Sequence, residues 1–241
     1  MDKKTILKVK DKTDSYYTKM DLFDLPCKLL INGKSHLSRK TNFILNFLLR
    51  STFYKSSFSG ENIFIVSNNR LDNKYKILMT EKDIPRENYM PYDEEELEIL
   101  YDQLEDEFLE EIDEGKKPSN KIIIFDDVAY GSHLKKTQGG IISKLIMNGR
   151  HLNLSSVYCS QKFSLLGTNI RSNVTGAILF NTSQKELELI ADDFNYLEKK
   201  KDFIKMFRDN TAEKHSFMVV NFTADNRNEM YLNSRFEPIT P

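Results

Sequence analysis

Runs of mostly apolar residues, separated by polar segments, set the pattern of this chain. They cover residues 27–31, 62–66, 121–125, 156–159, 176–180 and 217–221, and each predicts a buried β-strand. Between them, apolar residues recur every three or four positions, which predicts helices. One of these helices begins at Lys40. The others cover residues 92–113, 141–148, 185–193 and 199–207. Continuous apolar strands that alternate with helices indicate an α/β fold, with a largely parallel sheet flanked by helices.

The distribution of polar residues predicts how the chain is organised. The first 20 residues are polar, and we expect them to form a loosely attached N-terminal arm. Residues 21–241 are expected to form a single domain, which suits a chain of 241 residues. A strongly acidic helical insertion is expected around residues 92–114.

The acidic helix has a narrow apolar stripe. Its members recur at steps of three and four and are Leu97, Leu100, Leu104, Phe108 and Ile112. Most of the other positions are acidic. Two interpretations stay open: the acidic face is the solvated outside of a peripheral helix, or it is a docking surface.

Composition is that of an ordinary globular protein, with 39% hydrophobic and 29% charged residues. No apolar stretch approaches the roughly 18–20 residues that span a bilayer, so no membrane-spanning segment is expected. The start is too polar for a signal peptide, and we expect the protein to work inside a cell. Cys27 and Cys159 lie in apolar runs and are expected to be buried apolar residues rather than a disulfide framework.

The net charge of −1 gives no indication of nucleic-acid binding, but the charge is unevenly spread. A basic cluster follows the predicted helix at 185–193 and contains Lys199, Lys200, Lys201, Lys205 and Arg208. Such a cluster can contact the phosphates of a nucleic acid. A solvated helix face explains the same residues equally well.

The segment after the first strand has the features of a phosphate-binding loop. Such a loop needs a strand, exposed backbone N–H groups and a helix N-terminus, with a lysine for the phosphates and a Ser or Thr hydroxyl for Mg²⁺. The residues from Gly33 to Thr41, including Ser38, Arg39 and Lys40, match this order. Arg39 stands where the usual pattern has glycine, and the loop is one residue longer. A positive φ at Arg39 would cost roughly 1–2 kcal/mol.

Two aspartates follow the third predicted strand. In a parallel sheet, this places the carboxylates of Asp126 and Asp127 at the carboxyl edge, where ligands bind. Asp126 is predicted to hold Mg²⁺, and Asp127 to act as the general base on the attacking water. A strand that simply ends in a polar turn is the alternative. The presence of Lys40-Thr41 after an earlier strand favours the functional interpretation.

Three further polar residues are candidates for the catalytic site. Gln161 ends the fourth strand and is placed to orient water. Arg150 and Arg171 could each stabilise the transition state, either in their own subunit or from a neighbouring one. A surface salt bridge is the alternative for each arginine.

These motifs together resemble the poxvirus-type genome-packaging ATPases, which belong to the FtsK–HerA branch of P-loop motors in large DNA viruses and virophages. The matching residues are Asp126-Asp127-Val128, the segment 149–153, Gln161 and the segment 170–173. Residues 200–206 also resemble a basic helix of the poxvirus members. The resemblance covers roughly residues 25–222.

The resemblance implies a RecA-like fold that binds ATP and Mg²⁺ between the subunits of a homo-oligomeric ring, a pentamer or a hexamer. It implies a motor that drives double-stranded DNA into a preformed capsid, with capsid vertex or portal-like proteins as partners. It places the protein in the host cytoplasm, the viral factory or the virion. By position, Lys40 and Thr41 match the P-loop, Asp126 and Asp127 the Walker-B pair, and Gln161 the polar sensor. Arg150 and Arg171 match arginines of the family.

The altered loop leaves other functions open. A ring subunit that binds nucleotide poorly and serves as a structural or DNA-docking component is consistent with Arg39 and the longer loop. A nucleoside or nucleotide kinase is a more distant alternative, since nothing indicates an arginine-rich lid.

Overall fold

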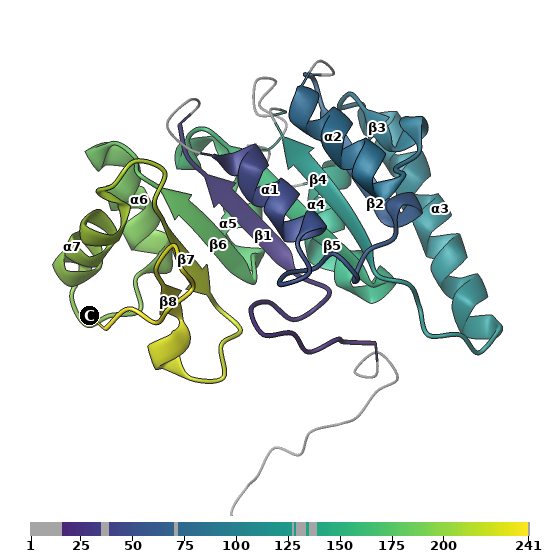
Figure 1. Cartoon of the computed structure of the whole chain (residues 1–241). Coiled ribbons are helices and arrows are strands. Elements are labelled where there is room, and N and C mark those ends of the chain that lie inside the picture. Colours follow the sequence, from purple (N-terminus) through teal and green to yellow (C-terminus); the bar gives the residue numbers. More distant parts are fainter. Residues whose placement is uncertain are drawn as a thin grey trace, which may run out of the picture.

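A central eight-stranded sheet organises the protein (Figure 1). The computed structural model describes residues 16–34, 39–69, 72–126, 128, 134 and 139–240. The strands follow the order β3-β2-β4-β5-β1-β6-β7-β8. Their bounds are β1 Lys28–Asn32, β2 Ile63–Ser67, β3 Tyr89–Met90, β4 Lys121–Asp126, β5 Leu154–Ser160, β6 Gly176–Phe180, β7 Phe217–Asn221 and β8 Tyr231–Leu232. Pairing is parallel from β3 to β6 and antiparallel at β7 and β8, which confirms the largely parallel sheet.

Helices cover both faces of this sheet. They are α1 Lys40–Leu49, α2 Asn73–Lys82, α3 Glu94–Asp113, α4 Gly140–Asn148, α5 Thr168–Asn173, α6 Gln184–Phe194 and α7 Lys200–Thr211. The 3-10 turns are η2 Gly60–Asn62, η3 Arg86–Asn88, η6 Gly149–Leu152, η7 Phe163–Leu165 and η8 Arg227–Glu229. Helices α1 and α2 contribute to one buried apolar cluster, and α3 to α7 contribute to the other. No helix in the described ranges is long and apolar enough to cross a membrane.

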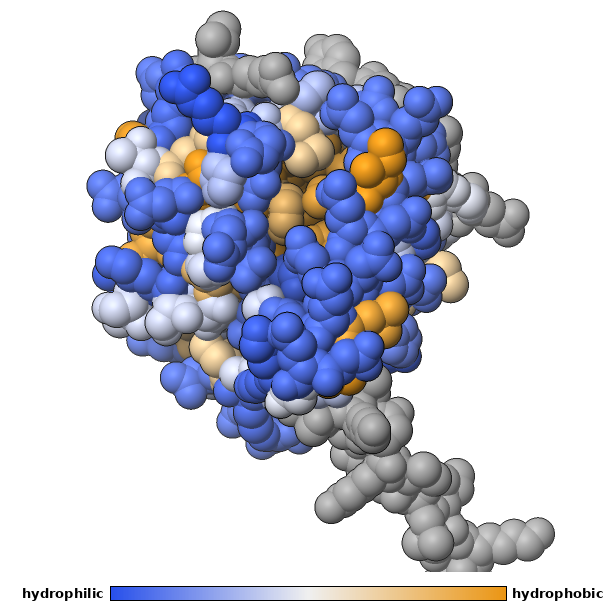
Figure 2. All heavy atoms as spheres, turned by 90° about the vertical axis from the view of Figure 1, so that its right-hand side faces the viewer, coloured by the Kyte–Doolittle hydropathy of each residue, from blue (hydrophilic) through white to orange (hydrophobic). Residues whose placement is uncertain are grey.

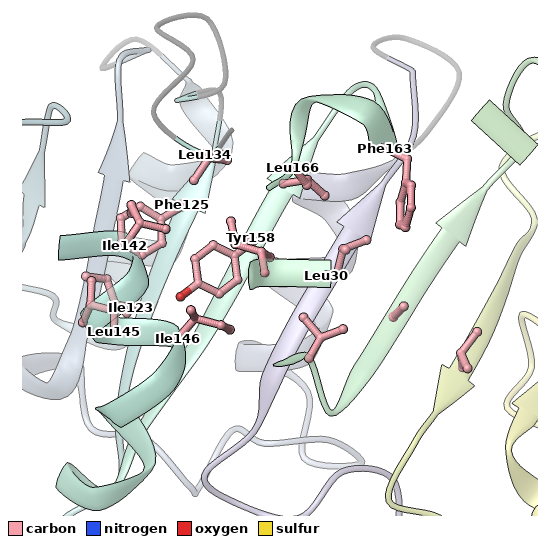
Figure 3. Close-up of a cluster of buried hydrophobic side chains, with 14 of the residues drawn as sticks. Leu30, Ile123, Phe125, Leu134, Ile142, Leu145, Ile146, Tyr158, Phe163 and Leu166 are labelled. Atoms are coloured by element: carbon pink, nitrogen blue, oxygen red, sulfur yellow. The ribbon is translucent and has the colours of Figure 1, made fainter. Parts of the chain in front are cut away.

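A stacked aromatic pair supports the ends of the two central strands. The rings of Phe125 on β4 and Tyr158 on β5 lie 5.3 Å apart with an interplanar angle of 3°. Ile142 and Ile146 of α4 lie over them (Figure 3). Burial of each such side chain contributes about 1.5–3 kcal/mol. Because Phe125 directly precedes Asp126, this packing holds the end of β4 in place.

The described end of the predicted N-terminal arm, residues 16–20, makes contacts with the rest of the domain. Backbone groups of Thr18 and Leu25 exchange two hydrogen bonds of 2.9 Å. The ammonium of Lys19 lies 2.7 Å from a carboxylate oxygen of Asp225. Lys19 therefore links this segment to the C-terminal part of the chain. Residues 1–15 lie outside the described ranges, so a loose arm there stays a prediction.

The acidic helix α3 belongs to one layer of the fold. Its side chains Leu97, Tyr101, Leu104 and Phe108 are buried in the cluster shared with α4 to α7. Tyr101, which is not in the predicted stripe, is buried, whereas Leu100 of that stripe is only partly buried. The buried face of the helix is therefore shifted slightly from the predicted one. Eleven of its 20 residues are Asp or Glu and none is Lys or Arg. The acidic side of the helix faces outward.

Candidate functional site

Predicted residues from several elements meet at one edge of the sheet. Strands β4, β5 and β1 are neighbours and run parallel, so their carboxyl ends lie at the same edge. Gly33 follows β1, Asp126 ends β4 and Gln161 follows β5. Lys40 begins α1 close to Gly33. Sequence positions far apart are thus brought together where ligands bind in parallel sheets.

The N-terminus of α1 has features that suit an anion. Its first turn contains no acidic residue, and the N-cap residue Arg39 makes no side-chain hydrogen bond to it. The buried ammonium of Lys40 donates a hydrogen bond of 2.9 Å to the carbonyl of Gly33. Backbone N–H groups without helical partners and the positive end of the helix dipole favour phosphate here.

Arg39 does not require glycine-like backbone geometry. Its φ is −112° and its ψ is 48°, so the left-handed strain considered for this position does not arise. Its exposed side chain lines a cavity of about 270 Å³ that runs along α1. Phe43, Phe180 and Phe217 form apolar walls of this cavity.

Three oxygen-bearing side chains converge at the end of β4. The hydroxyl of Thr41 lies 3.4 Å from Oδ2 of Asp126, and the hydroxyl of Tyr75 donates to the same oxygen at 2.7 Å. Asp126 is only 3% exposed. A hydroxyl and a carboxylate are hard oxygen donors, and Mg²⁺ usually takes one or two carboxylates together with phosphate oxygens and water. Thr41 and Asp126 therefore fit Mg²⁺.

Tyr75 is a site residue that sequence reasoning missed. It is fully buried on α2, a helix absent from the predicted elements. Burial, and then the negative charge of Asp126, raise its pKa well above the usual value. Its contact depends on the parallel pairing of β2 with β4, which places Ser67 opposite Asp126. No local pattern around Tyr75 could have revealed that pairing.

Comparison with known proteins identifies the family. The profile described as Poxvirus A32 protein matches residues 14–234, which is most of the chain. The chain belongs to the Poxvirus A32 protein family. This confirms the family that the motifs between residues 121 and 173 predict. None of the curated proteins matches the sequence.

Solved structures confirm the P-loop fold of this A32-family chain. The DNA-packaging ATPase B204 from Sulfolobus turreted icosahedral virus is 16% identical with a TM-score of 0.59, covering 90% of this chain and 99% of that one. The genome packaging NTPase B204 from Sulfolobus turreted icosahedral virus 2, in complex with AMPPCP, is 15% identical with a TM-score of 0.57, covering 88% and 98%. EssC ATPases 2 and 3 from Geobacillus thermodenitrificans are 11% identical with a TM-score of 0.57, covering 87% and 39%.

Two predicted site residues of the A32-family chain lie outside the described ranges. They are Ser38, in the loop before α1, and Asp127, which directly follows β4. The phosphate contact predicted for Ser38 and the general-base role predicted for Asp127 stay predictions.

Arg150 lies at the opposite edge of the sheet from Lys40. It belongs to η6, which precedes β5 and therefore lies at the amino end of that strand. Burial lowers the pKa of Lys28, the first residue of β1, and the nearby positive charge of Arg150 lowers it further. The arrangement excludes action of Arg150 on the site of its own subunit. A role at the site of a neighbouring subunit stays a prediction.

Arg171 forms an ion pair within the A32-family chain. Its guanidinium lies 2.7 Å from Asp193 on α6 and 5.1 Å from the ring centroid of Phe163. Burial raises the pKa of Asp193 even though Arg171 opposes that shift. These contacts match the salt-bridge alternative. A catalytic role would require this ion pair to open, and it stays a prediction.

The basic cluster lies on and just before α7, away from the residues around Asp126. Lys199, Lys201, Lys205 and Arg208 are exposed. Lys200 lies 2.6 Å from Asp192 and 3.1 Å from Glu188, both on α6. Contact of these basic residues with DNA stays a prediction.

A second, wider cavity is not part of this site. It measures about 1040 Å³ and lies between the N-terminal arm, the segment after α1 and the C-terminal segment, with Leu22, Phe53 and Phe236 among its walls. These segments adjoin the amino end of β1. The cavity therefore opens at the edge opposite to Lys40 and Asp126.

Proposed function

We propose that this A32-family chain is the motor ATPase of viral genome packaging, which couples hydrolysis of Mg-ATP to translocation of double-stranded DNA into a preformed capsid. The observation that carries the proposal is the meeting of Lys40, Thr41 and Asp126 at the carboxyl edge of a P-loop sheet. Family membership and the fold shared with the B204 packaging NTPases support it.

The described residues suit distinct parts of ATP binding. The N-terminus of α1 and the ammonium of Lys40 bind the phosphates, and the aromatic cavity beside Arg39 accommodates the purine base. Thr41 and Asp126 hold Mg²⁺, while Tyr75 fixes the orientation of the carboxylate. Held by these two side chains, Mg²⁺ would supply positive charge against the charge that develops on the transferred phosphoryl group. Asp127 accepts a proton from the attacking water, and Gln161 orients that water.

The proposal includes the setting in which the motor works. The chain assembles as a homo-oligomeric ring, a pentamer or a hexamer, and docks on capsid vertex or portal-like proteins. It works in the host cytoplasm or the viral factory and accompanies the virion. The structural neighbours that are packaging NTPases support the ring and the handling of DNA.

Duplex DNA is expected to stimulate ATP hydrolysis by the full-length chain. Steady-state phosphate release is measured with and without blunt duplex DNA over a range of salt concentrations. Because DNA contacts release counterions, the stimulation should fall steeply as salt rises. A basal ATPase that ignores DNA at low salt would support an NTPase but contradict the translocase.

A ring subunit that binds nucleotide poorly is the second candidate, based on the arginine at position 39 in place of glycine. The φ of −112° at Arg39 weakens this argument, because Arg39 does not adopt the left-handed backbone that favours glycine. Calorimetry with Mg-ATP separates the two functions. Micromolar binding supports the motor, whereas no binding at millimolar nucleotide favours the structural subunit.

Tyr75→Phe is expected to raise the Mg²⁺ concentration needed for half-maximal ATPase by roughly tenfold, the usual scale for a residue that orients a metal ligand. The change removes the hydroxyl that donates to Asp126 and keeps the buried ring. Mn²⁺ binding followed by electron paramagnetic resonance gives a readout independent of turnover.

Tyr54→Phe is the matched control for this change. Tyr54 is equally buried, and its hydroxyl makes two hydrogen bonds of 2.7 Å to the backbone of Phe23, away from Asp126. It should leave the metal requirement unchanged. If both variants shift the Mg²⁺ dependence alike, or if neither does, Tyr75 does not position Asp126.

A further inference from the structure

An apolar groove with an acidic rim lies at the β3 end of the sheet. It has a volume of about 310 Å³ and runs between α3 and the strands β2 and β3. The side chains that α3 contributes recur at steps of three and four and are Glu96, Ile99, Leu100, Gln103, Leu104 and Glu107. Phe64 and Met90 add to the apolar floor, and Glu61 and Glu87 to the rim. Figure 2 faces this side and shows apolar residues in a hollow among hydrophilic ones.

This groove leaves apolar surface and a strand edge in solvent. Within the described ranges, β3 pairs only with β2, so its outer backbone edge carries no strand. Ile99 is 59% exposed at the groove. An open strand edge beside exposed apolar side chains is typical of an interaction site. The acidic rim indicates a basic partner.

The opposite end of the sheet carries a matching surface. Tyr196 is 54% exposed, and its backbone N–H donates a 2.8 Å hydrogen bond to the hydroxyl of Tyr231 on β8, the last strand of the sheet. The exposed lysines Lys199, Lys201 and Lys205 follow it directly. Figure 1 shows α7 and α3 at opposite ends of the molecule. An aromatic anchor flanked by cations therefore lies opposite an apolar groove flanked by carboxylates.

We propose that the groove between β3 and α3 binds Tyr196 and the start of α7 from a second copy of this chain. The Tyr196 ring contacts Ile99 and Leu100, since tyrosine is a frequent anchor at interfaces. The lysines face the carboxylates of the rim, which aligns the two surfaces and speeds their encounter. At 1.5 Å per residue, the stripe from Glu96 to Glu107 is about 16 Å long, enough to face more than one turn of α7.

The contact joins different surfaces at opposite ends of the molecule, so it is head-to-tail. Such a contact repeats from one copy to the next and closes into a ring when the rotation allows it. The inference rests on the ring that the proposed function includes, and it names the two surfaces that meet. Assembly is measured without ATP hydrolysis, so a failed interface test leaves the ATPase result standing. The proposed contact also assigns the exposed lysines of α7 to a neighbouring subunit instead of DNA.

The test begins with the oligomeric state of the full-length chain, measured by sedimentation velocity over a range of concentrations. The wild type should assemble. Combined Lys199→Glu, Lys201→Glu and Lys205→Glu should raise the dissociation constant at least about tenfold, because like charges then meet at the interface. Lys55→Glu, Lys74→Glu and Lys76→Glu make the same change of net charge on exposed residues near α1 and α2. These control changes should leave assembly intact.

A charge swap then tests the pairing itself. Glu61→Lys, Glu87→Lys and Glu96→Lys should dissociate the assembly alone and restore it when combined with the three lysine reversals. Glu107 is left unchanged because it lies 3.7 Å from the buried ammonium of Lys121. A monomeric wild type, or a combined variant that stays dissociated while each set alone dissociates, would overturn the proposal. So would lysine reversals that weaken duplex DNA binding without changing assembly, and that result would assign α7 to DNA.

Discussion

Lys40→Ala is expected to lower the ATPase rate by roughly 10²–10³-fold, the scale for removal of one preorganised group that stabilises developing charge. The ammonium of Lys40 is buried at the start of α1 and lies 2.9 Å from the carbonyl of Gly33. Phosphate release by the purified variant measures the loss, and calorimetry with Mg-ATP shows how much of it comes from weaker binding.

Lys82→Ala is the matched control for the loss of Lys40. The Lys82 ammonium also binds backbone carbonyls, those of Lys55 and Phe58, on the surface of α2 away from Lys40. Both variants lose hydrogen bonds to the backbone, each with a stability cost of about 0.5–1.5 kcal/mol. The Lys82 variant should keep its ATPase rate. Equal ATPase rates in the wild type and the Lys40 variant would show that the segment from Gly33 to Thr41 does not bind the phosphates.

Strands β1, β2, β4, β5 and β6 were predictable from the sequence because each contains a mostly apolar run. Every residue of these strands is buried, since helices cover both faces of the sheet. A buried run needs no alternation of apolar and polar residues to be recognised. The helix α2 was not predictable in this way. Only Tyr75 and Leu78 of its ten residues are buried, so its apolar signal is weak.

The phosphate side of the site follows from local sequence, whereas the metal side depends on strand order. Lys40 and Thr41 begin a helix after a strand, and this placement can be recognised along the chain. The contact of Tyr75 with Asp126 requires β2 to lie beside β4, a pairing between residues far apart in sequence. Apolar runs alone do not specify which strands become neighbours.

For Arg150 the structure bears on one of the two catalytic roles that the sequence left open, action within its own subunit. It precedes the strand β5, and residues before a parallel strand lie at the amino edge. The candidate site lies at the carboxyl edge, so Arg150 cannot reach the site of its own subunit. This limit could have been drawn from the predicted strand at residues 156–159. The ion pair between Arg171 and Asp193, in contrast, needed the packing of α5 against α6.

Asp126→Asn is expected to lower the ATPase rate by at least about 10²-fold. This carboxylate helps to hold Mg²⁺, and without the metal the negative charge on the transferred phosphoryl group is no longer stabilised. Asparagine keeps the volume of the buried side chain and can still accept the hydrogen bond from Tyr75. The fold should therefore survive, and the thermal midpoint measured by circular dichroism should stay close to that of the wild type. The loss comes from the missing negative charge.

Nucleotide binding separates this variant from the loss of Lys40. The N-terminus of α1 and Lys40 remain in place, so calorimetry without added metal should give nearly the same affinity for ATP as the wild type. The contribution of Mg²⁺ to that affinity should disappear. Asp225→Asn removes a carboxylate that pairs with Lys19 at 2.7 Å on the surface and should change neither quantity. An Asp126→Asn variant that hydrolyses ATP at the wild-type rate with the wild-type Mg²⁺ dependence would show that another residue holds the metal.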